Sequence, residues 1–135
     1  MSRVALDTSA AIPFLLVRHE AHEAVMDRVA SLSVSMTGHS LIETYSVLTR
    51  LPGDARLLPG DASQLLEANF APPVLIDEQA VAGVPQVLAE HGIAGGAVYD
   101  ALVALAVKGT DVTLLTRDLR AVATYSVLDI FFELV

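Results

Sequence analysis

Short apolar runs alternate with longer segments of helical composition along the chain. Arg3–Leu6, Ser33–Met36 and Val112–Leu115 are such runs, and each is followed by a stretch that favours a helix. Strands of a parallel sheet are nearly continuous apolar runs, because helices cover both faces of the sheet. The alternation therefore predicts βαβ units, and with them an α/β fold built on a central, mainly parallel sheet.

The pattern also predicts where the individual elements lie. The expected strands are Arg3–Leu6, Ser33–Met36, Val74–Ile76, Val112–Leu115 and Leu128–Phe132. The expected helices are Ala10–Val17, Glu20–Ala30, His39–Leu51, a segment from Asp61 to about Phe70, Glu78–His91, Gly95–Lys108 and Leu119–Ala123. Pro13 predicts a kink or a shifted start in the first helix, and Pro85 weakens the assignment of the fifth. With 135 residues and no visible linker or repeat, we expect a single domain over residues 1–135.

Composition excludes several classes of function. The chain has no cysteine, which excludes a disulfide scaffold, a thiolate nucleophile and any cysteine-based metal site. Acidic residues outnumber basic ones 16 to 8, so a net charge of −8 argues against a general polyanion binder. The longest apolar stretches are far too short to span a membrane, and Asp7 interrupts any signal-peptide core. We therefore expect a soluble, cytoplasmic protein without membrane contact.

Asp100 is the most informative single residue. It lies in Gly95–Lys108, a helix that is apolar on all sides and is therefore expected to be buried. The residues three and four positions away are Gly96, Ala97, Val103 and Ala104, so no base can pair with it along the helix. A buried carboxylate without a partner costs several kcal/mol or becomes protonated. Its partner must come from elsewhere, either an arginine, a network of donors or a metal ion.

Three further carboxylates occupy related positions. Asp7 ends the first strand, Glu43 lies on the helix after the second, and Asp118 follows Val112–Leu115. Taken singly, each acid has an ordinary structural explanation. Asp7 and Asp118 could be helix caps, and Glu43 could be a solvated side chain on the helix surface. The strand ends and the facing helices of one parallel sheet could, however, bring all four acids together at one edge of the sheet. Clustered carboxylates are best neutralised by hard divalent cations such as Mg²⁺ or Mn²⁺, which polarise phosphoryl oxygens and activate water.

At these residues the sequence resembles the PIN-domain ribonucleases, and most closely the VapC-type toxins of bacterial toxin–antitoxin pairs. The segments that carry the resemblance are Ala5–Ala10, Leu41–Pro52, Tyr99–Ala104 and Leu114–Ala121. The resemblance covers nearly the whole chain in the family's order and spacing. It implies a PIN-like three-layer α/β/α sandwich.

The resemblance also implies an activity and a set of site residues. Asp7, Glu43, Asp100 and Asp118 would be the catalytic, metal-binding acids, Thr116 would match the family's hydroxyl near the metal, and Ser9 would help to orient Asp7. The implied reaction is Mg²⁺- or Mn²⁺-dependent cleavage of RNA, with tRNA or ribosomal RNA as the expected substrate. The implied partners are a cognate antitoxin, whose arginine would enter the carboxylate cluster, and a second copy in a homodimer.

Several side chains near these motifs could contact RNA. Arg117 and Arg120 flank Asp118 and are candidates for phosphate contacts, although a surface salt bridge is at least as good a reading of Arg120. His39 precedes Glu43 by one helical turn and could lie near the site. Tyr99 and Tyr125 could stack on bases, with packing in the core or at the rim as the ordinary alternative.

Two other functions remain open from the sequence. A receiver-like signalling domain is also a small α/β protein with acids at strand ends. That class needs an acidic pair after the first strand and a lysine late in the sheet, whereas here Asp7 stands alone and Lys108, the sole lysine, is on a helix. A catalytically inactive PIN module that serves only in binding is the second alternative, and the presence of all four acids argues against it.

Overall fold

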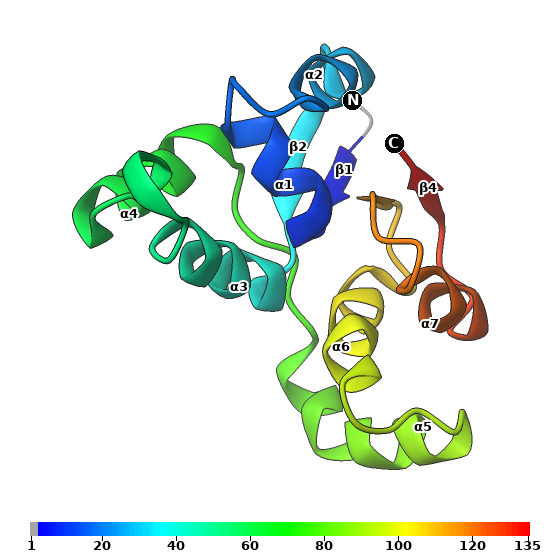
Figure 1. The fold of residues 1–135 in the computed structure, drawn as a ribbon. Helices are drawn as coiled ribbons and strands as arrows, with labels where there is room; N and C mark the ends of the chain where they lie inside the picture. The colour runs from blue at the N-terminus through cyan, green and yellow to red at the C-terminus, as the bar shows by residue number, and fades with distance from the viewer. Residues whose placement is uncertain (1–2) are drawn as a thin grey trace.

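The computed structural model describes residues 3–135, and four strands form its central sheet (Figure 1). The strands are β1 (Arg3–Leu6), β2 (Ser33–Met36), β3 (Thr113–Thr116) and β4 (Phe132–Leu134). Their order is β2-β1-β3-β4, and every pairing is parallel. β1 and β3 are therefore the inner strands, and their carboxyl ends lie side by side.

Helices connect the strands. They are α1 (Thr8–Leu15), α2 (His22–Val29), α3 (Gly38–Leu48), α4 (Pro59–Asn69), α5 (Val84–Glu90), α6 (Ala97–Val107) and α7 (Val122–Val127). Short 3-10 turns cover Gly53–Ala55 and Glu78–Gly83. Over residues 3–135 none of these helices combines the length and the apolar character needed to cross a bilayer.

Two apolar clusters lie on opposite faces of the sheet. Val4 and Leu6 of β1 point to the cluster that includes the buried sides of α1, α2, α3 and α4. Ala5, between them in sequence, points to the cluster formed with α6 and α7. This alternation follows from the two-residue period of a strand. Figure 1 shows α1 and α3 on one side of the sheet and α6 and α7 on the other, which confirms the expected three-layer α/β/α sandwich.

One expected strand is absent from the sheet, and another is displaced. Val74–Ile76 was expected to be a strand, but only Val74 forms a bridge, to Thr37. Pro72 and Pro73 precede it and have no N–H group, so they cannot extend the ladder. The last strand was expected over Leu128–Phe132, but Leu128 caps α7 and Asp129 has a φ of 56°, which delays the strand to β4.

The prolines act differently in two helices. Pro13 lies inside α1, whose start shifts to Thr8 rather than Ala10. The expected helix Glu78–His91 is divided, because a 3-10 turn runs to Gly83 and α5 begins at Val84 with Pro85 in its first turn. Proline is tolerated at that position because the first N–H groups of a helix have no intrahelical partner. The expected helix Leu119–Ala123 is found further along, as α7.

Candidate functional site

A small cavity of about 80 Å³ opens at the carboxyl ends of the inner strands. The side chains that line it come from the end of β1, from α1, α3, α6 and α7, and from the loop after β3. They are Asp7, Thr8, Ser9, His39, Glu43, Tyr99, Asp100, Val103, Asp118 and Tyr125. All four acids singled out in the sequence therefore line one cavity.

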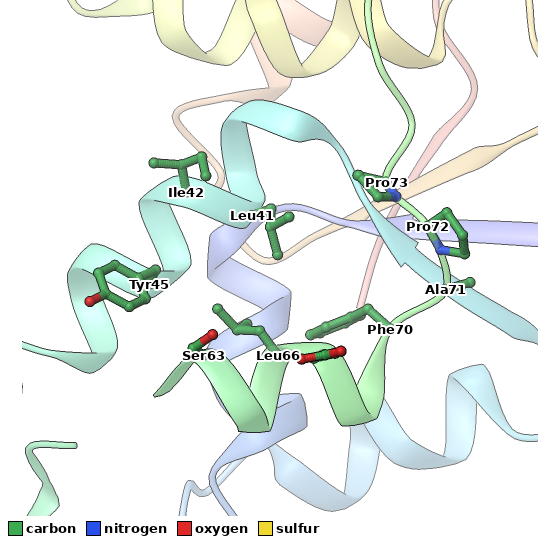
Figure 2. Close-up of a pocket in the computed structure, with 10 residues that line it drawn as sticks. Leu41, Ile42, Tyr45, Ser63, Leu66, Phe70, Ala71, Pro72 and Pro73 are labelled. Carbon is green, nitrogen blue, oxygen red and sulfur yellow. The ribbon is translucent and has the colours of Figure 1, made fainter. Parts of the chain in front are cut away.

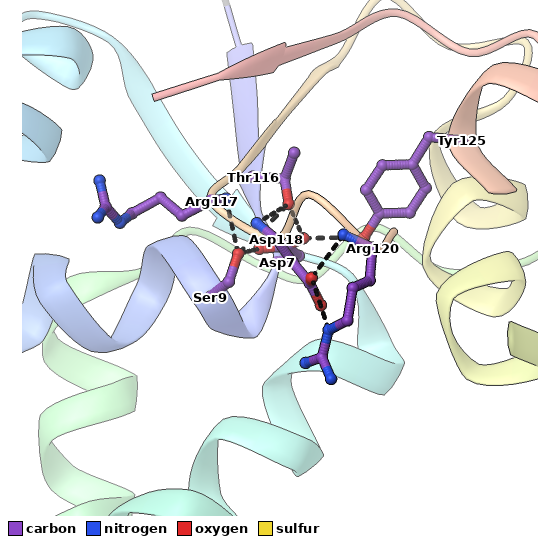
Figure 3. Close-up of polar contacts among 7 residues, drawn as sticks. All are labelled: Asp7, Ser9, Thr116, Arg117, Asp118, Arg120 and Tyr125. Carbon is purple, nitrogen blue, oxygen red and sulfur yellow. Dashed lines mark hydrogen bonds and ion pairs between the residues drawn. The ribbon is translucent and has the colours of Figure 1, made fainter. Parts of the chain in front are cut away.

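Asp7 lies at the floor of this cavity, with only 5% of its surface exposed. It caps α1, since the Ala10 N–H donates to its Oδ1 at 3.2 Å. The Ser9 hydroxyl donates to Oδ1 at 2.5 Å, the Thr116 hydroxyl to Oδ2 at 2.5 Å and the Tyr125 hydroxyl to Oδ2 at 2.8 Å. Figure 3 shows these side chains converging on Asp7 from three separate elements. The carboxylate is thus held in one orientation by four donors.

Burial and hydrogen bonding oppose one another at Asp7. Burial raises the pKa of the Asp7 carboxyl, because a low-dielectric environment disfavours its charged form. The hydrogen bonds from Ser9, Thr116, Tyr125 and the Ala10 N–H act in the other direction and lower the pKa, but the effect of burial is larger. The charged form of Asp7 is therefore present at a cost in stability.

Two of these donors are themselves fixed by the loop after β3. The Arg117 N–H donates to Ser9 Oγ at 2.7 Å, and the Asp118 N–H donates to Thr116 Oγ1 at 3.1 Å. Each hydroxyl thereby has its acceptor side occupied, which directs its own proton toward Asp7. Ser9 and Thr116 lie where the sequence analysis expected supporting hydroxyls.

Asp100 is less buried than its helix predicted. The first turn of α6 opens onto the cavity, so Asp100 is only half-buried, whereas Ala101 and Ala104 face the core. Burial raises the pKa of the Asp100 carboxyl, and the negative charges of Asp118, Asp7 and Glu43 raise it further. The negative charges of the other three acids therefore disfavour the ionised form of Asp100.

Arg120 and Arg117 differ in where their side chains lie (Figure 3). Arg120 is 94% exposed, its Nε lies 3.4 Å from Asp118 Oδ1, and its charge lowers the pKa of Asp100. The Arg117 guanidinium is directed away from the cavity and donates to the backbone oxygen of Val135 at 2.9 Å. Arg120 is therefore the arginine that borders the acidic cavity.

Glu43 is exposed on α3, while the half-buried Asp118 begins the turn that leads to α7. Asp118 Oδ1 accepts the N–H of Arg120 at 2.9 Å, which forms an Asx turn; the N-cap of α7 is Ala121, so the helix-cap alternative for Asp118 is wrong. Asp118 forms this turn and also lines the cavity. As the side chains stand, residues 3–135 contain no group of three or more acids or histidines close enough to hold a metal ion.

The donor chemistry nevertheless fits a hard divalent cation. The cavity is bordered by four carboxylates, and the charges of the other three add to the effect of burial in raising the pKa of Asp100. Carboxylate oxygens are the ligands that Mg²⁺ and Mn²⁺ prefer. Glu43 is exposed on α3, whereas Asp7 is held by four donors and Asp118 Oδ1 by the Arg120 N–H.

The contact between Tyr125 and Asp7 was not predicted from the sequence. Tyr125 is 1% exposed, so it cannot stack on a base, and its hydroxyl bonds to Asp7 from a position 118 residues away. Its place in α7 directly after an apolar segment resembled that of an ordinary core residue. Nothing in the local sequence indicates such a long-range partner.

A larger and mostly apolar pocket lies elsewhere, between α3 and α4 (Figure 2). Its volume is about 470 Å³, and Ile42, Tyr45, Leu66 and Phe70 are among the side chains around it. This pocket contains none of the four acids, so the chemistry of clustered carboxylates belongs to the smaller cavity.

Fold and site together define a class of protein: an α/β/α sandwich with acidic groups gathered at the carboxyl ends of parallel strands, where sites of such folds form. The chain belongs to the PIN domain family, whose family model matches residues 4–126. This assignment confirms the resemblance noted in the sequence and removes the receiver-like alternative.

Two relatives from Mycobacterium tuberculosis are similar over most of the chain. Ribonuclease VapC27 is 52% identical over 122 residues, which cover 90% of this chain and 89% of the relative. Ribonuclease VapC40 is 41% identical over 133 residues, which cover 98% of each protein.

Two solved structures share the fold. One is VapBC2 from Rickettsia felis bound to a DNA fragment from its promoter, with a TM-score of 0.68, 11% identity and 98% coverage of both chains. The other is FitAB bound to the IR36 DNA fragment, with a TM-score of 0.66, 20% identity and coverage of 97% of this chain and 94% of that chain.

Proposed function

We propose that this chain is a metal-dependent endoribonuclease and the toxin of a toxin–antitoxin pair. The observation that carries the proposal is the convergence of Asp7, Glu43, Asp100 and Asp118 on one cavity. It is supported by membership of the PIN family and by relatives named as VapC ribonucleases.

In this proposal Asp7, Glu43, Asp100 and Asp118 would together hold Mg²⁺ or Mn²⁺. When bound, the ion would supply a polarised phosphoryl oxygen and a water molecule activated for attack on the phosphodiester. Asp7 would be a ligand whose orientation is fixed before the ion binds, because Ser9 donates to one of its carboxylate oxygens and Thr116 to the other. Asp100 would bind the ion from α6, and the cation would offset the burial and the three neighbouring negative charges that disfavour its charged form.

Arg120 is the better candidate for a phosphate contact. It is almost fully exposed and borders the cavity, whereas the guanidinium of Arg117 is occupied by the Val135 carbonyl. Arg117 would then act through its N–H group, which orients Ser9. We propose an RNA substrate, either tRNA or ribosomal RNA.

A cognate antitoxin is the proposed protein partner. The proposal is supported by the fold that this chain shares with the VapBC2 and FitAB structures. A cavity bordered by four acids would also accept an arginine from a partner chain. The apolar pocket between α3 and α4 offers additional surface that a partner can cover (Figure 2). We also propose that the chain forms a homodimer.

The experiment that tests the function is cleavage of total bacterial RNA by the purified protein. Mg²⁺, Mn²⁺ and EDTA are compared, with Asp100→Ala as the matched variant because Asp100 is half-buried and its loss leaves the core intact. Discrete fragments that require metal and disappear in Asp100→Ala would support the proposal. If neither wild-type cleavage nor growth arrest on expression is seen, the chain is an inactive PIN module.

A further inference from the structure

Two aromatic rings stack at the mouth of the acidic cavity. The rings of His39 and Tyr99 have centroids 5.4 Å apart and planes inclined by 17°. Both residues line the cavity together with the four acids. They come from α3 and α6, the helices that also carry Glu43 and Asp100.

Tyr99 is poorly explained as a packing residue. Its side chain is 57% exposed, whereas Tyr125, which does pack in the core, is 1% exposed. It directly precedes Asp100 in the first turn of α6, so the ring is positioned next to a proposed metal ligand. An exposed aromatic ring in contact with one aromatic neighbour has surface available for another flat group.

The charge of the protein makes such a surface useful. With a net charge of −8 and four acids around the cavity, the protein repels the phosphates of a nucleic acid. Affinity from counterion release is therefore weak, because it depends on lysine and arginine contacts. Stacking of bases on aromatic rings supplies affinity without charge, and every base has a flat face.

We propose that Tyr99, supported by His39, binds an unpaired nucleobase beside the phosphodiester that is cleaved. The inference rests on the proposed ribonuclease function and names the feature of RNA that this site selects. Bases in a duplex have both faces covered by their neighbours, so the stacked pair selects single-stranded or looped RNA. His39 is a positioning residue, because it supports the ring of Tyr99 from α3.

The test measures RNA binding separately from cleavage. The full chain is titrated in EDTA against a fluorescein-labelled, unstructured 12-nucleotide RNA, and against the same strand annealed to its complement. Fluorescence anisotropy is recorded for wild type, Tyr99→Ala, Tyr99→Phe, His39→Ala and His39→Phe. Phe131→Ala is the matched control, because Phe131 is a 75% exposed aromatic residue that does not line the cavity.

We expect Tyr99→Ala to weaken binding of the single strand by about 5- to 100-fold, as loss of one stacked base does. The loss should be the same at 50 and 200 mM salt, because stacking releases no counterions. Tyr99→Phe and Phe131→Ala should bind as wild type does. His39→Ala should weaken binding less than Tyr99→Ala, and His39→Phe should restore it.

Several results would overturn the inference. They are equal binding of single strand and duplex by wild type, absence of binding to either, or unchanged binding by a folded Tyr99→Ala variant. The last result would assign the exposed ring to a protein partner instead. Failure of the ribonuclease function is distinguishable, because a wild-type protein that binds the single strand through Tyr99 but cleaves no RNA with Mg²⁺ or Mn²⁺ would refute only the activity.

Discussion

The hydroxyl of Tyr125 donates a hydrogen bond to Asp7 Oδ2 at 2.8 Å, across 118 positions of the sequence. Both groups are buried, so this bond joins α7 to the end of β1 inside the protein. Burial raises the pKa of the Tyr125 hydroxyl, and the charge of Asp7 raises it further, so the phenol stays protonated and acts as a donor. The proposed metal site and the folded core therefore share one hydrogen bond.

Removing this hydroxyl tests its contribution. Tyr125→Phe should lower the stability of the metal-free protein at pH 7 by about 1.5–3 kcal/mol, the usual value for a hydrogen bond to a charged group. The hydroxyl lowers the pKa of Asp7, so the difference from wild type should shrink as Asp7 becomes protonated at acid pH. Thermal unfolding in EDTA measures both effects. Tyr45→Phe, the same change on α3, serves as the control, and identical melting curves for Tyr125→Phe and wild type would contradict the prediction.

Asp100 should destabilise the protein when it is ionised. Its pKa is raised above the ordinary 3.8 by burial and by the neighbouring acids, so the folded state binds its proton more tightly than the unfolded state does. The stability from this raised pKa is present at low pH and lost as the pH rises through the folded-state pKa. Asp100→Asn should therefore raise the melting temperature at pH 7 by about 2–4 °C in EDTA. The gain should disappear toward pH 4, and an equal gain at both pH values would contradict this explanation.

Divalent metal should stabilise the fold, because it relieves the repulsion among the acids. Above the Kd, each tenfold increase in Mn²⁺ should add about 1.4 kcal/mol to the free energy of unfolding. Glu43→Gln is the variant of choice, because Glu43 is exposed and its loss leaves the apo fold unchanged. The variant should need more Mn²⁺ for the same rise in melting temperature. Calorimetric melts of both proteins over a metal series check this, and a wild-type curve insensitive to Mn²⁺ would count against the site.

Replacing Arg120 should affect RNA binding, whereas replacing Arg117 should affect stability. Arg120→Ala should weaken RNA binding and reduce the salt dependence by about one unit of log–log slope, as expected for one lost phosphate contact. Arg117→Ala should leave that slope unchanged but lower stability by about 1 kcal/mol, because its guanidinium holds the Val135 carbonyl. Anisotropy over a range of salt and thermal melts distinguish the two. Equal salt slopes for Arg120→Ala and wild type would remove Arg120 from the RNA surface.

Much of the fold was predictable because its signals are local. The apolar runs Arg3–Leu6 and Ser33–Met36 became strands over those residues, since buried parallel strands need little beyond continuous apolar character. Val74–Ile76 has the same apolar character but forms only one bridge, at Val74, because Pro72 and Pro73 before it have no N–H groups with which to extend the pairing to β2. Strand pairing is a property of two segments and cannot be read from one.

The sequence by itself determined the parallel α/β architecture, because strand ends and helix positions follow from local apolar spacing, and it singled out the four acids that line the cavity. Only the tertiary structure decided how these acids are supported. Ser9 lies within two residues of Asp7, but Thr116 and Tyr125 reach it from segments more than 100 positions away. The pairing of β1 with β3 and the packing of α7 on the sheet bring those hydroxyls together. Contacts of this kind depend on the path of the whole chain, and no local pattern of residues encodes them.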